Sequence, residues 1–416
     1  MCIRDRFLYL HQYTVKFESN LEVTKCDIKL EFIDSLKLPH TVRKYQLDAI
    51  NHALSNQRTL LVSPTASGKS LVIYILVRYL KLKTLILVPT ISLVTQMFQD
   101  FRSYGWDAAN NCHTVYAGRD KGSELPVVIS TWQSLYKMPQ KYFEQYQMVV
   151  GDEAHGFKSK SLTSIMTKCI NAKYRIGATG TLDGTLTHKL VLEGLFGKVF
   201  KVTSTKKLID AKHLSPFKIN ALVLKHPDSI CFDLRKSNYQ EELEYLISSK
   251  ARNVFIKNLV LDLDTNTLLL FRFVEKHGRL LYNMIKEKTD VMHRKTFFVY
   301  GGTDSNTREQ IRHIVESERD AIIVASYGVF SVGVNIRNLH NIVFASPTKS
   351  RIRNLQSIGR GLRKSEKKNI ATLYDIADDI SYKEKKNYTL EHFEERVEIY
   401  KDEKFPLHTY RIALKT

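Results

Sequence analysis

Short apolar runs alternate with longer amphipathic segments along most of the chain. In the first half, five runs rich in β-branched and aliphatic residues predict strands: residues 59–62, 84–88, 127–131, 148–150 and 175–178. Several of these runs are apolar at consecutive positions, which is typical of strands buried on both faces of a parallel sheet. Helical patterns at residues 69–80 and 93–104 lie between them. This order predicts an α/β fold with helices covering a parallel sheet.

The same alternation begins again after Pro216. Six further runs predict strands: residues 218–224, 267–271, 296–300, 321–324, 341–344 and 371–374. Helical patterns at residues 252–263 and 307–318 separate some of them. The end of the chain is expected to be helical, because four residues follow 3- and 4-residue spacing: Leu390, Phe393, Val397 and Tyr400. We therefore expect two α/β units joined near residues 203–216.

Length and composition limit the classes of protein. A chain of 416 residues fits two to three domains of roughly 100–200 residues each. No apolar run approaches the ~18–20 residues of a membrane-spanning helix. Residues 1–6 are charged and lack the apolar core of a signal peptide. They differ from the sequence that follows and are interpreted as an artefact of how the sequence was obtained. The five cysteines are far apart and form no C-x-x-C, so neither a zinc site nor a disulfide framework is indicated. We expect a cytoplasmic protein with no membrane partner.

The net charge of the chain indicates which kind of partner it binds. Lys and Arg number 63 against 43 Asp and Glu, which gives +20. From Tyr382 onward the chain has eight basic and seven acidic residues, so the excess lies in the body of the protein. Basic side chains that neutralise phosphates release condensed counterions, which favours a nucleic-acid partner. A basic surface that only keeps the protein soluble is the alternative.

Residues 58–75, RTLLVSPTASGKSLVIYI, join a predicted strand to a predicted helix through a loop of small residues. The loop matches the P-loop pattern G-x-x-x-x-G-K-[ST], with Ser63 in place of the first Gly. Backbone N–H groups at such a helix start surround phosphate oxygens. Lys69 would reach the β- and γ-phosphates, and the Ser70 hydroxyl would ligate Mg²⁺. The phosphate-binding residues are Pro64, Thr65, Ala66, Ser67, Gly68, Lys69 and Ser70. By itself the loop fits a kinase, a transporter ATPase, a GTPase or a helicase.

The segment MVVGDEAH at residues 148–155 supplies a second element of the site. An apolar strand delivers Asp152 and Glu153 to its carboxyl end, where ligands bind in open α/β sheets. Asp152 would hold Mg²⁺ through its coordination shell, and Glu153 would orient and deprotonate the attacking water. Together with the P-loop, this pair predicts an NTPase.

These two segments resemble motifs of superfamily 2 helicases, and other segments resemble further motifs of that family in the expected order. They are Arg43 to Gln46, Val88 to Thr90, Ser130 to Ser134, Ala178 to Thr181, Ser326 to Gly333, and Gln356 to Arg363, which fits Q-x-x-G-R-x-x-R. Within the superfamily, the chain from about residue 41 onward resembles recombination helicases of T-even phages. Ala154 departs from the Cys that we associate with these helicases.

A helix that carries Arg360 and Arg363 at i, i+3 presents both guanidinium groups on one face. Arginines supplied in this way can stabilise charge on the γ-phosphate and can be worth ~10³–10⁵ in rate. The neighbouring Arg351 and Arg353 are interpreted as a solvated or phosphate-binding face. We therefore predict Lys69, Glu153, Arg360 and Arg363 as the catalytic residues.

The resemblance implies two tandem RecA-like domains, an ATP-binding domain at residues 41–205 and a second domain at residues 206–380. A remnant at 1–40 and a helical segment at 381–416 flank them, whereas family members carry an additional N-terminal DNA-binding domain. It implies ATP and Mg²⁺ as cofactors, with adenine selected by Gln46. Further ATP-binding residues implied by the matching motifs are Tyr45 and Gly333.

The resemblance also implies roles for residues outside the catalytic set. Coupling between ATP and the nucleic acid is assigned to His155, Thr179, Thr181 and Gln356. Contacts to nucleic-acid phosphates, which carry no sequence code, are assigned to Pro89, Thr90, Thr131, Ser326 and Ser331. Trp132 could stack on a base, and it fits a core position equally well.

The implied activity is ATP-dependent translocation on DNA with remodelling of branched structures and R-loops. The implied partners are single-stranded and branched DNA, with an RNA–DNA hybrid as a further candidate, and a monomer is favoured. Three alternatives stay open: an RNA helicase, the motor subunit of a restriction-type nuclease, and a non-catalytic nucleic-acid-binding scaffold. Glu384-Lys385-Lys386 is a fragment of the E-x-K pattern that the nuclease alternative requires.

Overall fold

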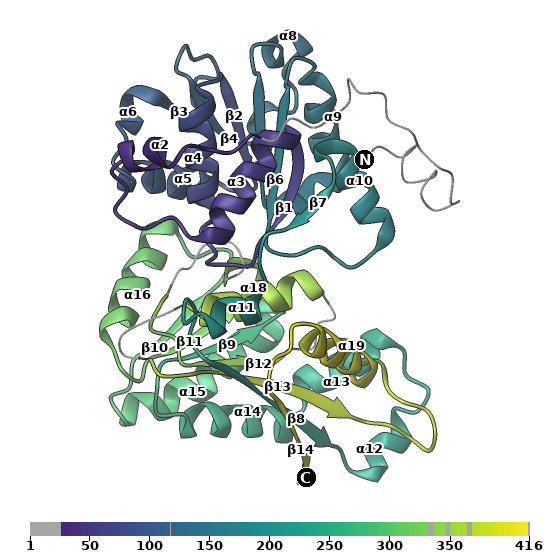
Figure 1. Ribbon diagram of the computed structural model, residues 1–416. Coiled ribbons are helices and arrows are strands. Elements are labelled where there is room, and N and C mark those ends of the chain that lie inside the picture. Colours follow the sequence, from purple (N-terminus) through teal and green to yellow (C-terminus); the bar gives the residue numbers. More distant parts are fainter. Residues whose placement is uncertain (1–25, 117, 331–335, 347–349, 364–367, 415–416) are drawn as a thin grey trace. The chain divides into compact units, whose positions relative to one another are not determined.

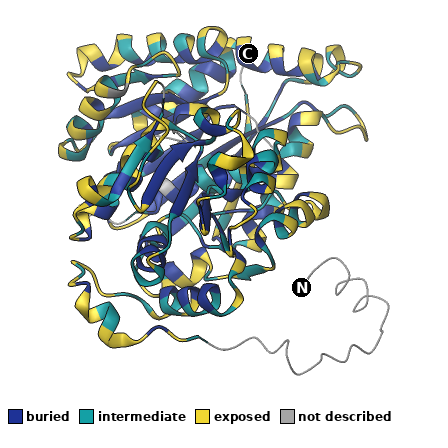
Figure 2. Cartoon of the chain, turned by 90° about the horizontal axis from the view of Figure 1, so that it is seen from above, coloured by how far each residue is buried: buried dark blue, intermediate teal, exposed yellow. Residues whose placement is uncertain are grey.

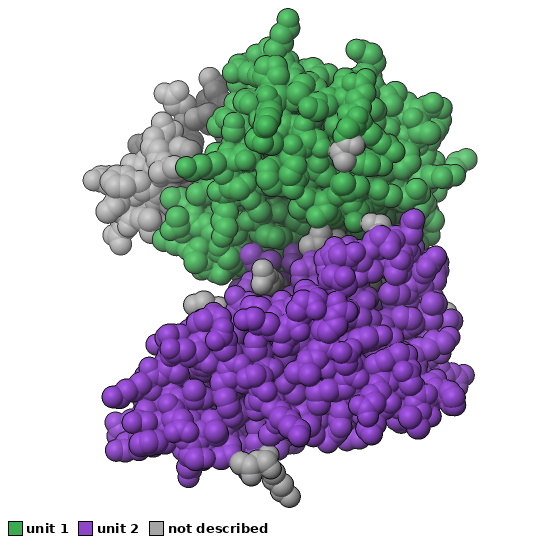
Figure 3. All heavy atoms as spheres, turned by 180° about the vertical axis from the view of Figure 1, so that it is seen from behind, with its two compact units in different colours: residues 1–204 green, residues 205–416 purple. Residues whose placement is uncertain are grey.

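The computed structural model describes residues 26–116, 118–330, 336–346, 350–363 and 368–414, apart from the side chains of residues 305, 330, 353 and 360. The chain divides into two compact units, residues 1–204 and 205–416, which are coloured separately in Figure 3. Each unit is an α/β domain with its own parallel sheet, as expected (Figure 1). No described helix has the length and apolarity needed to cross a membrane.

The first unit contains a seven-stranded sheet within its described residues, in the order β3-β4-β2-β5-β6-β1-β7. All of its strand pairs are parallel. The strands are β1 (Arg58–Val62), β2 (Thr84–Val88), β3 (Cys112–Val115), β4 (Val127–Thr131), β5 (Met148–Asp152), β6 (Tyr174–Thr179) and β7 (Val199–Lys201). The helices are α2 (Leu30–Ser35), α3 (Lys44–Asn56), α4 (Lys69–Leu80), α5 (Ile91–Ser103), α6 (Ala108–Asn111), α7 (Trp132–Leu135), α8 (Gln140–Phe143), the 3₁₀ helix η2 (Ala154–Lys158), α9 (Lys160–Lys168) and α10 (Leu186–Phe196).

Two apolar cores lie on opposite faces of this sheet. Successive residues of one strand contribute to different cores: Leu61 packs with residues of α3, α4 and α5, and Leu60 packs with residues of α9 and α10. This alternation follows from the two-residue period of side chains along a strand. Figure 2 shows the result as buried strands between helices whose outer faces are exposed. Burial on both faces explains why the central strands read as continuous apolar runs.

The second unit also contains a seven-stranded parallel sheet within its described residues, in the order β10-β11-β9-β12-β13-β8-β14. The strands are β8 (Phe217–Lys225), β9 (Thr267–Phe271), β10 (Thr296–Val299), β11 (Ile322–Ser326), β12 (Asn341–Phe344), β13 (Ala371–Asp379) and β14 (Leu407–Ala413). The helices are α11 (Thr205–Asp210), α12 (Asp228–Asp233), α13 (Tyr239–Ser248), α14 (Lys250–Asp262), the π-helical turn η3 (Val274–Gly278), α15 (Arg279–Val291), α16 (Ser305–Ser317), α17 (Tyr327–Phe330), α18 (Arg351–Gly361) and α19 (Tyr388–Asp402).

The two sheets have the same topology. When β8 is counted as the first strand of its unit, β9 as the second and so on, both sheets follow the order 3-4-2-5-6-1-7. The first strand of each unit therefore lies between the sixth and seventh strands. The chain consists of two tandem RecA-like units.

The end of the chain contains a strand as well as the expected helix. The spaced apolar residues lie in α19, where Phe393 and Tyr400 are buried. The chain then turns back, and β14 pairs in parallel with β8 at the edge of the sheet. The interpretation of residues 381–416 as helical therefore missed a strand, because Leu407–Ala413 is mostly exposed and lacks a continuous apolar run.

Candidate nucleotide site and motor motifs

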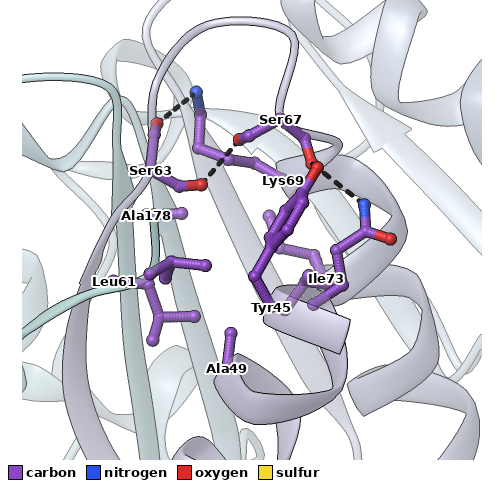
Figure 4. Close-up of a pocket in the computed structure, with 11 residues that line it drawn as sticks. Tyr45, Ala49, Leu61, Ser63, Ser67, Lys69, Ile73 and Ala178 are labelled. Carbon is purple, nitrogen blue, oxygen red and sulfur yellow. Dashed lines mark hydrogen bonds between the residues drawn. The ribbon is translucent and has the colours of Figure 1, made fainter. Parts of the chain in front are cut away.

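The loop between β1 and α4 has the backbone conformation of a phosphate cradle. Ala66 and Gly68 have φ of 65° and 84°, in the left-handed region. A Cβ on Gly68 would also lie 2.3 Å from Nε2 of Gln46, so this position requires glycine on two grounds. Ser63 does not have a positive φ, which explains why a serine can replace the usual glycine there. Its hydroxyl donates to Oγ of Ser67 at 2.7 Å and closes the loop (Figure 4).

Lys69 lies at the start of α4 and points back into the loop. Its Nζ donates to the carbonyl oxygen of Ser63 at 3.2 Å (Figure 4) and to that of Pro64 at 3.4 Å. Gly180, which follows β6, adjoins the same ammonium, because a Cβ there would lie 3.8 Å from Nζ. A phosphate bound in the loop can replace these carbonyls as the partner of Lys69, because a charge-assisted bond to an anion is the stronger one.

Tyr45 and Gln46 hold the loop from α3. The Tyr45 hydroxyl and Nε2 of Gln46 donate to the Ser67 carbonyl at 3.0 and 2.9 Å, and Oε1 of Gln46 accepts from the N–H of Arg43. A primary amide has two donors and two acceptor lone pairs. Gln46 therefore has one further N–H and one further lone pair beyond the bonds to Arg43 and Ser67. Beneath the loop, these residues line a pocket with an aliphatic floor from Leu61, Ile73, Ala178 and others (Figure 4).

Asp152 is the last residue of β5 and Glu153 follows it; β5 lies two strands away from β1, the P-loop strand. Oδ1 of Asp152 is buried and has no hydrogen-bond partner among the described residues. Burial, together with the Glu153 carboxylate, raises the pKa of Asp152 to about 6, and nearby Lys69 opposes the shift. A buried carboxylate oxygen without a hydrogen-bond partner is suited to accept from a water molecule that is bound to a cation. Among the described residues no group of three or more His, Cys, Asp or Glu could hold a metal ion.

Glu153 has φ of 49° and begins η2 in the left-handed region. A non-glycine residue in this conformation carries strain, and such residues gather at functional sites. Nδ1 of His155 lies 3.3 Å from Oε2 of Glu153 and 3.1 Å from Oγ1 of Thr179. Oγ1 of Thr179 in turn donates to the Thr181 carbonyl at 3.1 Å. The structure therefore places the predicted coupling residues of the first unit in one chain of contacts that starts at Glu153.

Three residues beside these motifs were not predicted from the sequence: Tyr104, His188 and Asp183. The Tyr104 hydroxyl, at the end of α5, lies 3.0 Å from Oγ of Ser70, and burial raises the pKa of Tyr104 to about 12. If Ser70 donates to Tyr104, its lone pairs remain for a cation. His188 of α10 contacts the carbonyl oxygen of His155 at 2.9 Å and Oδ1 of Asp183 at 2.8 Å, so it fastens the segment after Thr181 to η2. No sequence pattern marks these tertiary contacts.

The expected nucleic-acid residues of the first unit lie at one edge of its sheet. Val88 pairs with Thr131 across β2 and β4, which brings Thr90 and Thr131 to the same carboxyl end. Thr90 caps α5 by accepting from the N–H of Leu93, and Oγ1 of Thr131 lies 2.9 Å from Oγ of Ser134. Pro89 accepts a bond from Gln133 at 3.4 Å. Trp132 begins α7 and is partly buried against the adjacent core, so its packing role is present.

The motif residues of the second unit are only partly described. Ser326 ends β11 opposite Phe271 of β9 and is nearly buried. Gln356 lies on α18, which ends at Gly361. Arg363 therefore follows the helix, and the expectation that one helix carries both Arg360 and Arg363 is wrong, because the chain leaves the helical conformation before Arg363. Arg360 also lies on α18, but its side chain is outside the described residues, as are Ser331 and Gly333 entirely.

A P-loop, a buried aspartate and a strained glutamate at one edge of a RecA-like sheet define a nucleotide-hydrolysing motor domain, and the tandem second unit is typical of helicases. The family described as type III restriction enzyme, res subunit, matches residues 39–184. The ATP-dependent DNA helicase uvsW of Enterobacteria phage T4 is 36% identical over 382 residues, which cover 87% of this chain and 75% of that protein. The chain belongs to the superfamily 2 helicases, within the family that contains the uvsW helicase.

More distant relatives agree with this fold. The DNA 3'-5' translocase XPB2 of Sulfurisphaera tokodaii is 25% identical over 82% of this chain and 84% of that protein. The solved structure of the ATP-dependent Type ISP restriction-modification enzyme LlaBIII bound to DNA matches with a TM-score of 0.65 at 17% identity, covering 91% of this chain and 32% of that one. As a member of its family, the protein is an ATP-hydrolysing enzyme that unwinds nucleic acid.

Proposed function

We propose that the protein is an ATP-dependent DNA helicase that translocates on single strands and remodels branched DNA and R-loops. The observation that carries the proposal is the chain of contacts from Glu153 through His155 to Thr179, beside the P-loop. Such a connection lets a change at the attacking water reach the segment that follows β6. The basic excess of +20 supports a polyanionic track. We propose that the protein acts in the cytoplasm, which is the host cytoplasm if a phage encodes it, and that it acts as a monomer.

In the proposed mechanism, ATP binds with its phosphates in the loop of residues 63–68 and its adenine against Gln46. Lys69 leaves the carbonyls of the loop and binds the β- and γ-phosphates. Ser70 and Asp152 are the residues that would hold Mg²⁺, which supplies charge neutralisation for the transferred phosphoryl group. Glu153 orients the attacking water and takes its proton. His155 passes the change in the charge of Glu153 to Thr179.

The second unit contributes the groups that respond to the γ-phosphate. We propose that Arg360 and Arg363 stabilise the charge on this phosphate in the transition state, which makes hydrolysis depend on both units. The backbone and hydroxyl groups near Thr90, Thr131, Ser326 and Ser331 would bind DNA phosphates without reading sequence. Gln356, Tyr45 and Gly333 keep their predicted roles as parts of this proposal.

The first test is the rate of ATP hydrolysis by Glu153→Gln, with and without single-stranded DNA. The amide keeps the shape of the side chain and cannot take a proton, so DNA-stimulated kcat should fall by about 10²–10⁴-fold while DNA binding persists. The control is Glu144→Gln, because Glu144 lies in the same unit and its carboxylate accepts a hydrogen bond from Gln140 at the surface. DNA-stimulated turnover that survives the substitution of Glu153 would exclude it as the base.

The second test concerns the substrate. Forked duplexes, R-loops and four-way junctions, each with ATP and with a non-hydrolysable analogue, separate a remodelling enzyme from a simple translocase. Branched substrates should be resolved with ATP only. Stimulation of the ATPase by RNA rather than by DNA would favour the RNA-helicase alternative, and cleavage of DNA would favour the nuclease motor.

A further inference from the structure

The C-terminal end of α18 is held by two residues from outside the helix. Carbonyl groups in the last turn of a helix lack intrahelical partners. Here Nζ of Lys368 donates to the carbonyl of Gly361 at 2.7 Å and also to the carbonyl of Arg363. Ser215 donates its N–H to the carbonyl of Leu362 at 2.9 Å and its hydroxyl to the carbonyl of Arg363 at 3.3 Å. Three successive carbonyls are thereby fixed, the last of which belongs to Arg363 itself.

The same lysine reaches a second segment. Its Nζ donates to the carbonyl of Arg337 at 3.1 Å, and the N–H of Arg337 donates to Oε1 of Glu316 on α16 at 2.6 Å. An ammonium group has three N–H donors, and three backbone carbonyls surround this one. Lys368 is only 6% exposed, which is rare for a lysine without a specific task. It therefore joins the end of α18 to the segment that follows Ser326–Gly333.

We propose that Lys368 is a positioning residue for Arg363. It holds the backbone of Arg363 so that the guanidinium meets the γ-phosphate during hydrolysis. The inference rests on the role of Arg363 in the proposed function. Lys368 acts through the end of α18 and the two residues that follow it, and not on ATP. Without the ammonium, three backbone carbonyls each lose a donor and the end of α18 can shift. A misplacement of ~1 Å in a catalytic group can cost about 10²-fold in rate.

The charge state of Lys368 is consistent with this task. Burial lowers the pKa of Lys368 to about 8, with the Arg363 guanidinium lowering the pKa further and Glu316 opposing the change. At neutral pH the ammonium therefore stays protonated and keeps all three donors.

The experiment compares Lys368→Met, Lys368→Arg and Lys368→Met combined with Arg363→Ala, measured as kcat and KM for ATP in saturating single-stranded DNA. Lys368→Met should lower kcat by about 10- to 100-fold and leave KM within about twofold. Lys368→Arg should recover most of the loss, because a guanidinium keeps the charge and the donors. Lys295→Met is the matched control, since Lys295 pairs with Glu318 at the surface of the same unit and should leave kcat unchanged.

The double variant distinguishes positioning of Arg363 from a general contribution of Lys368 to the stability of the unit. If Lys368 acts through Arg363, the double variant should be no slower than Arg363→Ala alone. A multiplicative loss of kcat in the double variant would overturn the inference, as would an unchanged kcat in Lys368→Met. If Arg363→Ala itself keeps full kcat, the proposed role of Arg363 is wrong as well, so the two failures are distinguishable.

If Lys368→Met does not fold, Ser215→Ala provides the second variant. It removes one donor to the Arg363 carbonyl and keeps the backbone N–H that binds Leu362. A loss of about two- to tenfold in kcat, absent in the Arg363→Ala background, supports the inference; an equal loss in both backgrounds overturns it.

Discussion

The imidazole of His155 lies 3.1 Å from the Thr179 hydroxyl and also contacts the carboxylate of Glu153. This places one side chain between the proposed base and the end of β6. His155→Ala should therefore separate hydrolysis from its stimulation. We expect basal ATPase activity to persist while the stimulation by single-stranded DNA falls by about tenfold, a loss typical of a removed charge-linked hydrogen bond. Steady-state ATPase assays with and without DNA measure both quantities.

The control for this prediction is His408→Ala, because His408 is exposed on β14 in the other unit. An equal fall in basal and stimulated rates after His155→Ala would show that His155 supports the base and does not couple the site to DNA.

Tyr104 provides the second prediction. Tyr104→Phe removes the hydroxyl that lies 3.0 Å from Oγ of Ser70 and keeps the buried ring, which packs against Tyr74. Without this partner the Ser70 hydroxyl loses a contact that fixes its orientation, and in the proposed mechanism this hydroxyl holds Mg²⁺. The apparent KM for Mg·ATP should rise by about 2- to 10-fold, the range for one hydrogen bond. Titration of Mg²⁺ at fixed ATP measures the effect.

Tyr146→Phe is the matched control, because its hydroxyl contacts Tyr142 in the other core of the same unit. An unchanged Mg²⁺ dependence in Tyr104→Phe would exclude Tyr104 from the metal site.

The central strands of both sheets were predictable from sequence because burial on two faces requires continuous apolar runs, as in Thr84–Val88. The prediction missed β3, β7 and β14, all of which are edge strands. An edge strand has fewer neighbours to pack against, so residues such as His408 and Thr409 are tolerated and the apolar signal disappears. Strand order is set by long-range packing and left no local pattern.

The residues of the candidate site likewise differ in whether the sequence alone could predict them. Lys69, Ser70, Asp152 and Glu153 belong to local patterns whose spacing reflects the chemistry, so the sequence predicted them. Tyr104 contacts Ser70 across 34 positions, and no residue near Tyr104 indicates this contact. Contacts between segments distant in sequence depend on the three-dimensional fold.

Arg396 provides a prediction about stability. Its guanidinium makes two bonds of 2.9 Å to the carboxylate of Asp375 on β13, and the Tyr400 hydroxyl donates to the same carboxylate at 2.8 Å. Arg396 and Asp375 are both buried. Arg396→Leu leaves a buried carboxylate without its counter-charge, so the free energy of unfolding should fall by about 3–5 kcal/mol. Chemical denaturation, followed through the unfolding transition of the second unit, measures this free energy.

The control is Lys401→Ala on the same helix, because Lys401 pairs with Glu398 in solvent and should change the free energy of unfolding by less than about 0.5 kcal/mol. Equal stability of Arg396→Leu and the parent protein would mean that Asp375 takes up a proton at little cost.

The pH dependence of Lys368 provides a prediction in which activity and stability change in opposite directions. The pKa of Lys368 is lowered from 10.5 to about 8 by burial, with Arg363 and Glu316 as the charged groups that face it. Above pH 8 the folded protein loses this proton, the ammonium loses donors to the carbonyls of α18, and kcat should fall. Between about pH 8 and 10.5 the unfolded chain binds more protons at this residue than the folded one, so its contribution to the free energy of unfolding should rise with pH.

Other groups also contribute to the pH dependence, so the measured quantity is the difference between the parent protein and Lys368→Arg. Arginine stays protonated throughout. Relative to Lys368→Arg, the parent should lose kcat and gain stability as pH rises from 7.5 to 9.5. A parallel change of kcat in both proteins would place the activity-limiting proton elsewhere. A fall in the relative stability of the parent would show that the pKa of Lys368 is raised by its partners and not lowered by its burial.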